Sequence, residues 1–269
     1  MGKEEGQKRQ EGQREFDIVV GVQRNLLNRF GRYRTSSWQP TRDNILILED
    51  EPFNQKMIEE AEPEGIDPAV VNDLVGYASF GTRSLYVRST EGRGQAFKQT
   101  IAHEILHLWF MRQMLDEGDP ASDGVNETFV DTLALEGLRY FHLPRKAREP
   151  EIDGAINNSA IIKGVIERLG ERGWEGLFRA CQSGEQRQIA SLMERTFGSQ
   201  PKRALRQTND SLQVVFGKNF WGRFKELALM TYLQRSDPTF QAKHRAVDHQ
   251  MQLIIEWAQI DPKYLRELQ

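Results

Sequence analysis

The stretch IAHEILHLWF, residues 101–110, constrains the fold more than any other part of this sequence. Seven of its ten residues are apolar, which predicts a helix, from about residue 94 to residue 115, that lies in a core. His103, Glu104 and His107 interrupt the apolar run. A neutral polar group buried without a partner costs about 2–7 kcal/mol. The fold must therefore provide something that satisfies these three side chains.

The composition indicates a globular chain without a general affinity for polyanions. Of the 269 residues, 38% are hydrophobic and 28% are charged, and the formal charge of −3 predicts no bulk attraction to nucleic acid or anionic membranes. The sequence has no apolar run of about 18 residues and no apolar N-terminal signal segment. Its one cysteine, Cys181, excludes an intrachain disulfide. We expect a cytoplasmic location.

Hydrophobic spacing predicts helices and short strands in the first half of the chain. Residues 1–14 are polar throughout after Met1 and predict a flexible tail. The expected elements are a helix at 16–30, strands at 44–49, 74–80 and 84–89, and helices at 94–115 and 125–141. We expect the strands at 74–80 and 84–89 to pair in an antiparallel manner across Gly81.

A change in composition after Leu143 suggests a boundary between two lobes. The segment PRKAREPEIDG, residues 144–154, is the best linker candidate, and the pattern beyond it is helical. We therefore predict an α+β protein. Its first lobe, residues 15–143, would hold a short mixed or antiparallel sheet and the helix containing residues 101–110. An all-helical lobe would follow over residues 144–269.

Two histidines four residues apart are the first sign of a metal site. On a helix, His103 and His107 project from one face about one turn apart, where both ring nitrogens can reach one Zn²⁺ ion at about 2.0–2.1 Å. Glu104 points about 100° around the helix, beside the metal and not onto it. This is the H-E-x-x-H pattern, in which the glutamate acts on a metal-bound water.

Two histidines need a third ligand to hold zinc well. The metzincin pattern would place glycine at 110 and histidine at 113, and the sequence has Phe110 and Gln113 instead. Glu127 follows His107 by 20 residues, and Asp131 lies four further on, on the same helical face as Glu127. A carboxylate so placed can accept the outer N–H of a ligand histidine and fix its tautomer.

The combination of H-E-x-x-H with N-E-x-x-x-D (NETFVD, residues 126–131) resembles the gluzincins, the thermolysin-like zinc peptidases. The similarity covers about residues 74–141 and implies a zincin-like first lobe that binds one Zn²⁺ ion. It implies that His103, His107 and Glu127 are metal ligands and that Glu104 is the general base. Asp131 would support His103, and Asn126 would support the ligand turn.

The same resemblance implies a substrate-binding strand and a group that stabilises the oxyanion. The backbone of Tyr77, Ala78 and Ser79 would hold an extended peptide by strand addition. Gluzincins also use a histidine or tyrosine of the second lobe, for which the candidates are His249, His244 and Tyr232, with His142 and Tyr140 nearer in sequence.

Glu136, in LALEGLRYF, is a rival third ligand because other gluzincins take a ligand from a similar E-G-L segment. It follows Glu127 by nine residues, so the two carboxylates project from opposite faces of a helix and cannot both coordinate one ion. The spacing to His107 and the presence of Asp131 favour Glu127.

These residues predict a zinc-dependent metallopeptidase that hydrolyses peptide bonds through a zinc-bound water, with Glu104 as general base. Its partner would be a peptide or protein substrate, with no nucleic acid and no membrane. One alternative is a non-catalytic regulatory or interaction protein organised by zinc, which would not need Glu104. Another is a zinc hydrolase that acts on a non-peptide amide.

Overall fold

The computed structural model describes residues 2–61, 71, 74–89, 94–110, 120–153, 155, 156, 159 and 163. The chain divides into two compact units, one of residues 1–111 and 133–155, and the other of residues 112–132 and 156–269. The described part of the first unit has a mixed α/β fold, with helices and a three-stranded sheet. The predicted lobe boundaries stay predictions, because most of residues 144–269 lie outside the described part.

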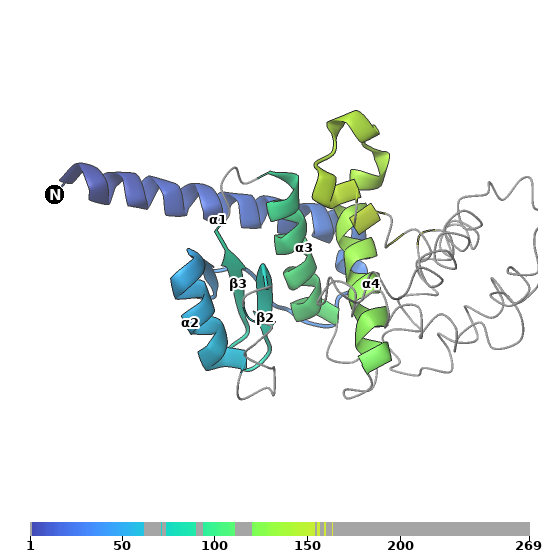
Figure 1. The fold of residues 1–269 in the computed structure, drawn as a ribbon, viewed down its shortest axis with the longest axis horizontal. Helices are drawn as coiled ribbons and strands as arrows, with labels where there is room; N and C mark the ends of the chain where they lie inside the picture. Colours follow the sequence, from blue (N-terminus) through green and yellow to red (C-terminus); the bar gives the residue numbers. More distant parts are fainter. Residues whose placement is uncertain are drawn as a thin grey trace, which may run out of the picture. The chain divides into compact units, whose positions relative to one another are not determined.

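The first helix, α1, runs from Gly2 to Phe30 (Figure 1). The sequence pattern predicts a start near Phe16, and the helix begins fourteen residues earlier. Residues 2–14 contain mainly Glu, Lys, Gln and Arg, which favour helix, and no proline. The flexibility expected of residues 1–14 stays a prediction. The buried side chains of α1 follow helical spacing and include Val19, Val22, Leu26 and Phe30.

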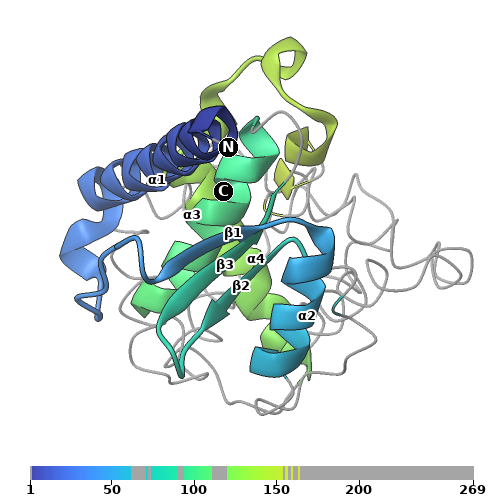
Figure 2. The same ribbon diagram turned by 90° about the vertical axis from the view of Figure 1, so that its left-hand side faces the viewer.

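The sheet consists of β1 (Ile45–Leu48), β2 (Gly76–Ser79) and β3 (Ser84–Arg88) in the order β1-β3-β2 (Figure 2). The antiparallel pairing of β2 with β3 is confirmed, with Tyr77 opposite Tyr86. β1 is parallel to β3, so the sheet is mixed. Among the described strands β2 lies at an edge of the sheet.

Helix α2 (Asp50–Ala61) was missed by the sequence reading. Its first turn carries Asp50, Glu51 and Pro52. Acidic residues and proline are favourable at this end of a helix. Phe53 and Met57, four residues apart, are both fully buried. These local signals were present in the sequence, but three large apolar residues among twelve, Phe53, Met57 and Ile58, give a weak periodic pattern.

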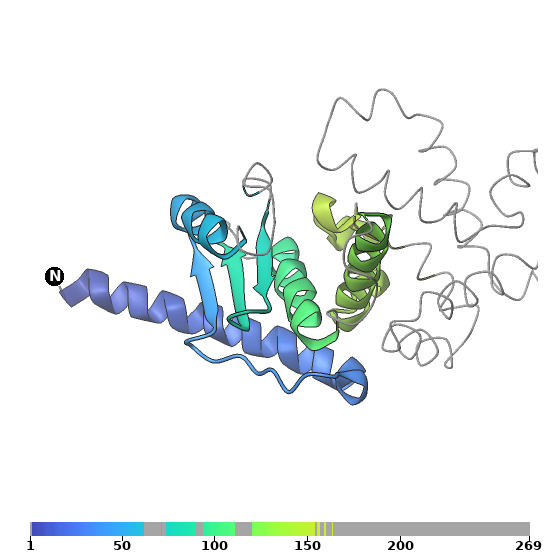
Figure 3. The same cartoon turned by 90° about the horizontal axis from the view of Figure 1, so that it is seen from below.

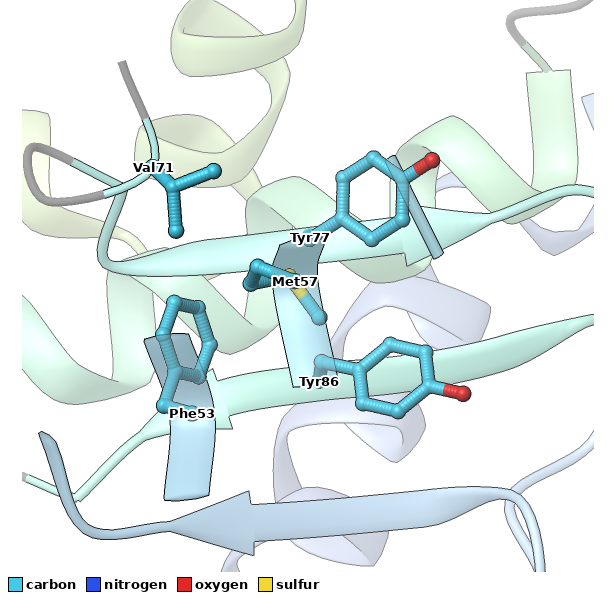
Figure 4. Packing of buried hydrophobic residues seen from close by; sticks show 5 residues of the cluster. All are labelled: Phe53, Met57, Val71, Tyr77 and Tyr86. Carbon is cyan, nitrogen blue, oxygen red and sulfur yellow. The ribbon is translucent and has the colours of Figure 1, made fainter. Parts of the chain in front are cut away.

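The side chains of Phe53, Met57, Val71, Tyr77 and Tyr86 form a core cluster on the α2 face of the sheet (Figure 4). Because successive residues of a strand point to opposite faces, Gly76 and Ala78 lie on the other face of β2.

Helix α3 (Gln95–Phe110) covers that other face, so the strands lie between α2 and α3 (Figures 1 and 3). It packs against β2, β3 and α1. Most of its apolar side chains are buried. They are Phe97, Ile101, Ala102, Ile105, Leu106, Leu108 and Trp109. The core position expected of this helix is confirmed.

Both ends of α3 are tied to other segments of the first unit. At the start, the backbone N–H groups of Gln95 and Ala96 donate to the Glu149 carboxylate, at 2.9 and 2.8 Å. At the end, the backbone N–H and the hydroxyl of Thr35 donate to the carbonyl of Trp109, at 3.2 and 2.7 Å. These contacts satisfy helix-terminal groups that have no partner within the helix.

Helix α4 (Pro120–Gly137) replaces the predicted helix at 125–141. It begins with proline, which is favourable in the first turn of a helix. It ends at Gly137 because Arg139 adopts a left-handed backbone conformation, with φ of 62°. A β-carbon at position 137 would lie 2.4 Å from Leu26 Cδ2, so the helix end packs closely on α1. Its later part, from Leu133, belongs to the first unit.

The segment predicted as a linker, residues 144–154, belongs to the first unit at least as far as Asp153. It contains the short 3-10 helix Arg145–Ala147 and Glu149, whose carboxylate binds the start of α3. A second 3-10 helix, Tyr140–His142, precedes it. No helix in the described part of the chain has the length and apolar character needed to cross a bilayer.

Glu60 of α2 should make the stability of the fold depend on pH. Burial raises its pKa, but hydrogen bonds from Lys56, Ser79 and Tyr86 outweigh burial and lower the pKa below the ordinary 4.5. A lowered pKa stabilises the folded state above pH 4.5, and this contribution is lost as the pH falls through the folded-state pKa. We predict that Glu60→Gln lowers the free energy of unfolding at pH 7, and that its difference from the wild type shrinks below pH 4.5. Denaturant unfolding of both proteins at pH 7 and below pH 4.5 measures these free-energy differences.

Glu51→Gln, which changes an exposed carboxylate in the first turn of the same helix, is the control and should lose at most about 0.3–1 kcal/mol through the helix dipole. An equal loss for Glu60→Gln at neutral and acidic pH would contradict this account.

Candidate metal centre

His103 and His107 lie one turn apart on α3, and their rings converge. Their Nε2 atoms are 2.9 Å apart, and the ring centroids are 4.7 Å apart with 62° between the planes. Both residues are partly buried, so neither ring is fully shielded from solvent. At this distance the two nitrogens either share one proton or direct their lone pairs toward one cation.

Glu127 of α4 brings a third ligand atom to the pair. One nitrogen of each histidine and one Glu127 carboxylate oxygen all lie within 4.8 Å of one another. α4 is one continuous helix from Pro120 to Gly137, and its end packs on α1 through Gly137. This is the group of three that the spacing of the sequence predicts.

The donor set fits zinc better than it fits a hard cation. Two imidazole nitrogens and one carboxylate oxygen are ligands that Zn²⁺ takes, whereas Mg²⁺ and Ca²⁺ prefer oxygen alone. Two nitrogens bound to one tetrahedral zinc at about 2.0–2.1 Å lie about 3.3 Å apart. The observed 2.9 Å between His103 Nε2 and His107 Nε2 differs by only a few tenths of an ångström, so a small change in side-chain torsion would accommodate the ion.

The Glu104 carboxylate lies directly under strand β2. Its side chain is buried, with 8% of the residue exposed. A β-carbon at Gly76 would lie 2.8 Å from Glu104 Oε1 and 2.6 Å from Thr100 Cγ2, closer than such carbons approach in real proteins. The absence of a side chain at position 76 therefore lets the backbone of β2 approach Glu104 and Thr100.

The role of Gly76 was missed by the sequence reading, although a signal existed. Glycine within a strand often marks a close approach of the backbone to another group. The strand was correctly predicted, but which face of it would meet Glu104 depends on the packing of α3 against β2.

The residues expected to support the ligands lie in α4. Asp131 is buried, with 4% exposed, one turn after Glu127. Asn126 precedes Glu127 in the same helix. Their proposed contacts, including that of Asp131 with His103, stay predictions.

The rival ligand Glu136 binds elsewhere. Its Oε1 accepts from Arg29 Nη2 at 2.9 Å, and its Oε2 lies 3.8 Å from His142 Nε2. Within the described part of the chain, the group that could hold a metal contains Glu127 and does not contain Glu136. This grouping supports the preference for Glu127 over Glu136, which stays a prediction.

The side chains of the predicted substrate-binding strand differ in orientation. Those of Tyr77 and Ser79 lie on the α2 face, where the Ser79 hydroxyl is 3.2 Å from Glu60 Oε2. Ala78 lies on the α3 face. All three are buried, so a substrate would meet the backbone of this strand more than its side chains. Their role in substrate binding stays a prediction.

The candidates for oxyanion stabilisation are only partly placed. His249, His244 and Tyr232 lie outside the described residues, as does Cys181. Tyr140 is buried and its hydroxyl donates to the carbonyl of Gln95 at 3.4 Å. Burial and, to a smaller extent, the nearby Glu149 raise the pKa of Tyr140 to about 12, so it stays protonated near neutral pH. The His142 side chain is largely exposed, near Glu136.

Comparisons of the chain with protein families, with curated proteins and with solved structures find no match. The resemblance to gluzincins therefore stays a prediction that rests on the motifs and on the group of His103, His107 and Glu127.

We predict that Gly76→Ala destabilises the protein by about 1–3 kcal/mol, because the added methyl group must push β2 away from Thr100 and Glu104. Gly21→Ala is the control. A β-carbon at position 21 of α1 would meet nothing within 4 Å, so this variant should gain about 0.5–1 kcal/mol. Denaturant unfolding of both variants tests the close approach, and a Gly76→Ala protein as stable as Gly21→Ala would contradict it.

Proposed function

We propose that this protein is a zinc-dependent metallopeptidase. The observation that carries the proposal is one arrangement of four side chains. The ligand atoms of His103, His107 and Glu127 converge within 4.8 Å, and the buried carboxylate of Glu104 follows His103 directly on the same helix.

His103, His107 and Glu127 would hold the ion. Zinc, when bound, lowers the pKa of a coordinated water toward neutrality and polarises a carbonyl. Three protein ligands leave one tetrahedral position for water or substrate, which is typical of catalytic zinc, whereas structural sites have four protein ligands.

Glu104 would act as general base and then as general acid. Its carboxylate accepts a proton as water attacks the scissile carbonyl carbon. It then donates this proton to the leaving amine nitrogen as the C–N bond breaks, so the carboxylate is regenerated in each cycle. Proton transfer of this kind contributes about 10²–10⁴-fold to the rate.

The surroundings of Glu104 support a catalytic site over a purely structural one. A metal that only organises a surface requires its ligands and nothing more, yet the chain places a carboxylate next to them at 8% exposure. The backbone of β2 lies closely over this carboxylate because position 76 is glycine. The backbone of β2 at the edge of the described sheet can add a peptide strand beside Glu104.

The test compares wild-type protein with Glu104→Gln and with the control Glu51→Gln, an exposed site on α2. Elemental analysis should find about one zinc per chain in all three proteins. Hydrolysis of a mixed peptide library should fall about 10²–10⁴-fold in Glu104→Gln and stay at the wild-type rate in Glu51→Gln. Undiminished hydrolysis by Glu104→Gln, or wild-type protein that binds zinc and cleaves no peptide, would overturn the proposal.

A further inference from the structure

A cavity of about 500 Å³ lies between the start of β2, the end of β3, the first turns of α3 and residues 149–151. This volume falls within the range of sites that bind small molecules or side chains. All of its lining residues belong to the first unit.

The cavity lies in line with the candidate metal centre along α3. Ala96 and Thr100 line it, and the spacing of residues 96, 100, 103 and 107 places them on one face of the helix. Thr100 also lies against Gly76, as Glu104 does. One helical turn, about 6 Å of rise, separates Thr100 from Glu104. An extended peptide advances about 3.3–3.6 Å per residue, so the cavity begins within two residues of a bond held at Glu104.

The walls of the cavity are largely apolar. Val87 and Phe97 are buried at 0% and 4% exposure, whereas Val75 is 53% exposed beside the cavity. An exposed large apolar side chain at the mouth of such a cavity would be covered by the aliphatic part of a bound side chain.

The charges at the cavity favour a cation. Among the described lining residues Arg88 is the cation, but its guanidinium is already bound to Asp50, Asn54 and the carbonyl of Leu74. Two carboxylates, those of Glu149 and Glu151, also line the cavity. The Glu149 carboxylate accepts hydrogen bonds from the first backbone N–H groups of α3. The partial positive charge at this helix end offsets about half of the negative charge of the carboxylate. Glu151 is exposed, so the lining residues that the structure describes keep a net negative charge.

We propose that this cavity binds a lysine or arginine side chain of the peptide substrate, within two residues of the cleaved bond. The apolar walls contact the aliphatic stem, and the carboxylates of Glu151 and Glu149 attract the cationic end. The inference rests on the proposed peptidase function and adds a substrate class to it: peptides that carry a basic residue next to the cleavage site.

The kinetic test uses peptides that differ at one position near the cleaved bond, with lysine, norleucine or glutamate there. Wild-type kcat/KM should be highest for lysine and lowest for glutamate. In Glu151→Gln the ratio of lysine to norleucine should fall about two- to fivefold, the range expected for one partly exposed ion pair. In Glu151→Lys norleucine should be preferred, and Glu51→Gln should keep the wild-type ratio. A wild-type protein that prefers norleucine, or a ratio unchanged in Glu151→Lys, would overturn the inference.

A binding test separates this inference from the proposed function. The same peptides are titrated into Glu104→Gln and into the double variant Glu104→Gln/Glu151→Gln, with calorimetry as the readout. The lysine peptide should bind about two- to fivefold more tightly than the norleucine peptide to the first protein and equally to the second. If this difference appears while the wild type cleaves nothing, the cavity assignment stands and the peptidase proposal fails. If cleavage occurs without any dependence on residue 151, the cavity assignment fails alone.

Discussion

Helix α3 has to keep two imidazoles and a carboxylate on a surface that is otherwise apolar, and the described fold is arranged around this requirement. Ile101, Ile105 and Trp109 are buried almost completely, while His103 and His107 keep partial access to solvent. The apolar side chains hold the helix against β2, β3 and α1. A convergent pair of ring nitrogens on such a rigidly packed helix is suited to hold a cation, because little ordering remains to be done when the cation binds.

The neighbouring segments hold the same helix in place. Glu149 and Thr35 bind its two ends, and the glycine at position 76 lets β2 lie directly over Glu104. The group that would bind metal and the group that would move protons are thus positioned by different contacts. Glu127 of α4 completes the group of possible metal ligands with His103 and His107, whereas β2 lies closely against Glu104. In the proposed function, this separation would let one carboxylate bind the ion while another acts on water beside it.

Much of this arrangement could be predicted from the sequence because it depends on local spacing. The i, i+4 histidines, the core position of residues 101–110 and the antiparallel pair of strands follow from periodicity and are seen in the structure. Helix α2 could not be predicted in this way, because its buried side is carried mainly by Phe53 and Met57. Local spacing also does not predict the parallel pairing of β1, the contact of Gly76 with Glu104 or the binding of Glu149 to α3, because each joins residues distant in sequence.

The central claim is that two imidazoles and the Glu127 carboxylate hold one zinc ion. X-ray absorption at the zinc edge tests it most directly when wild-type protein is compared with Glu127→Gln and Glu136→Gln. We predict two imidazole ligands with nitrogen and oxygen distances of about 2.0–2.1 Å in the wild type. The spectrum should be unchanged in Glu136→Gln, whereas Glu127→Gln should show altered zinc ligands or lose the zinc. A wild-type spectrum without histidine scattering, or one that changes with Glu136 and not with Glu127, would contradict the account.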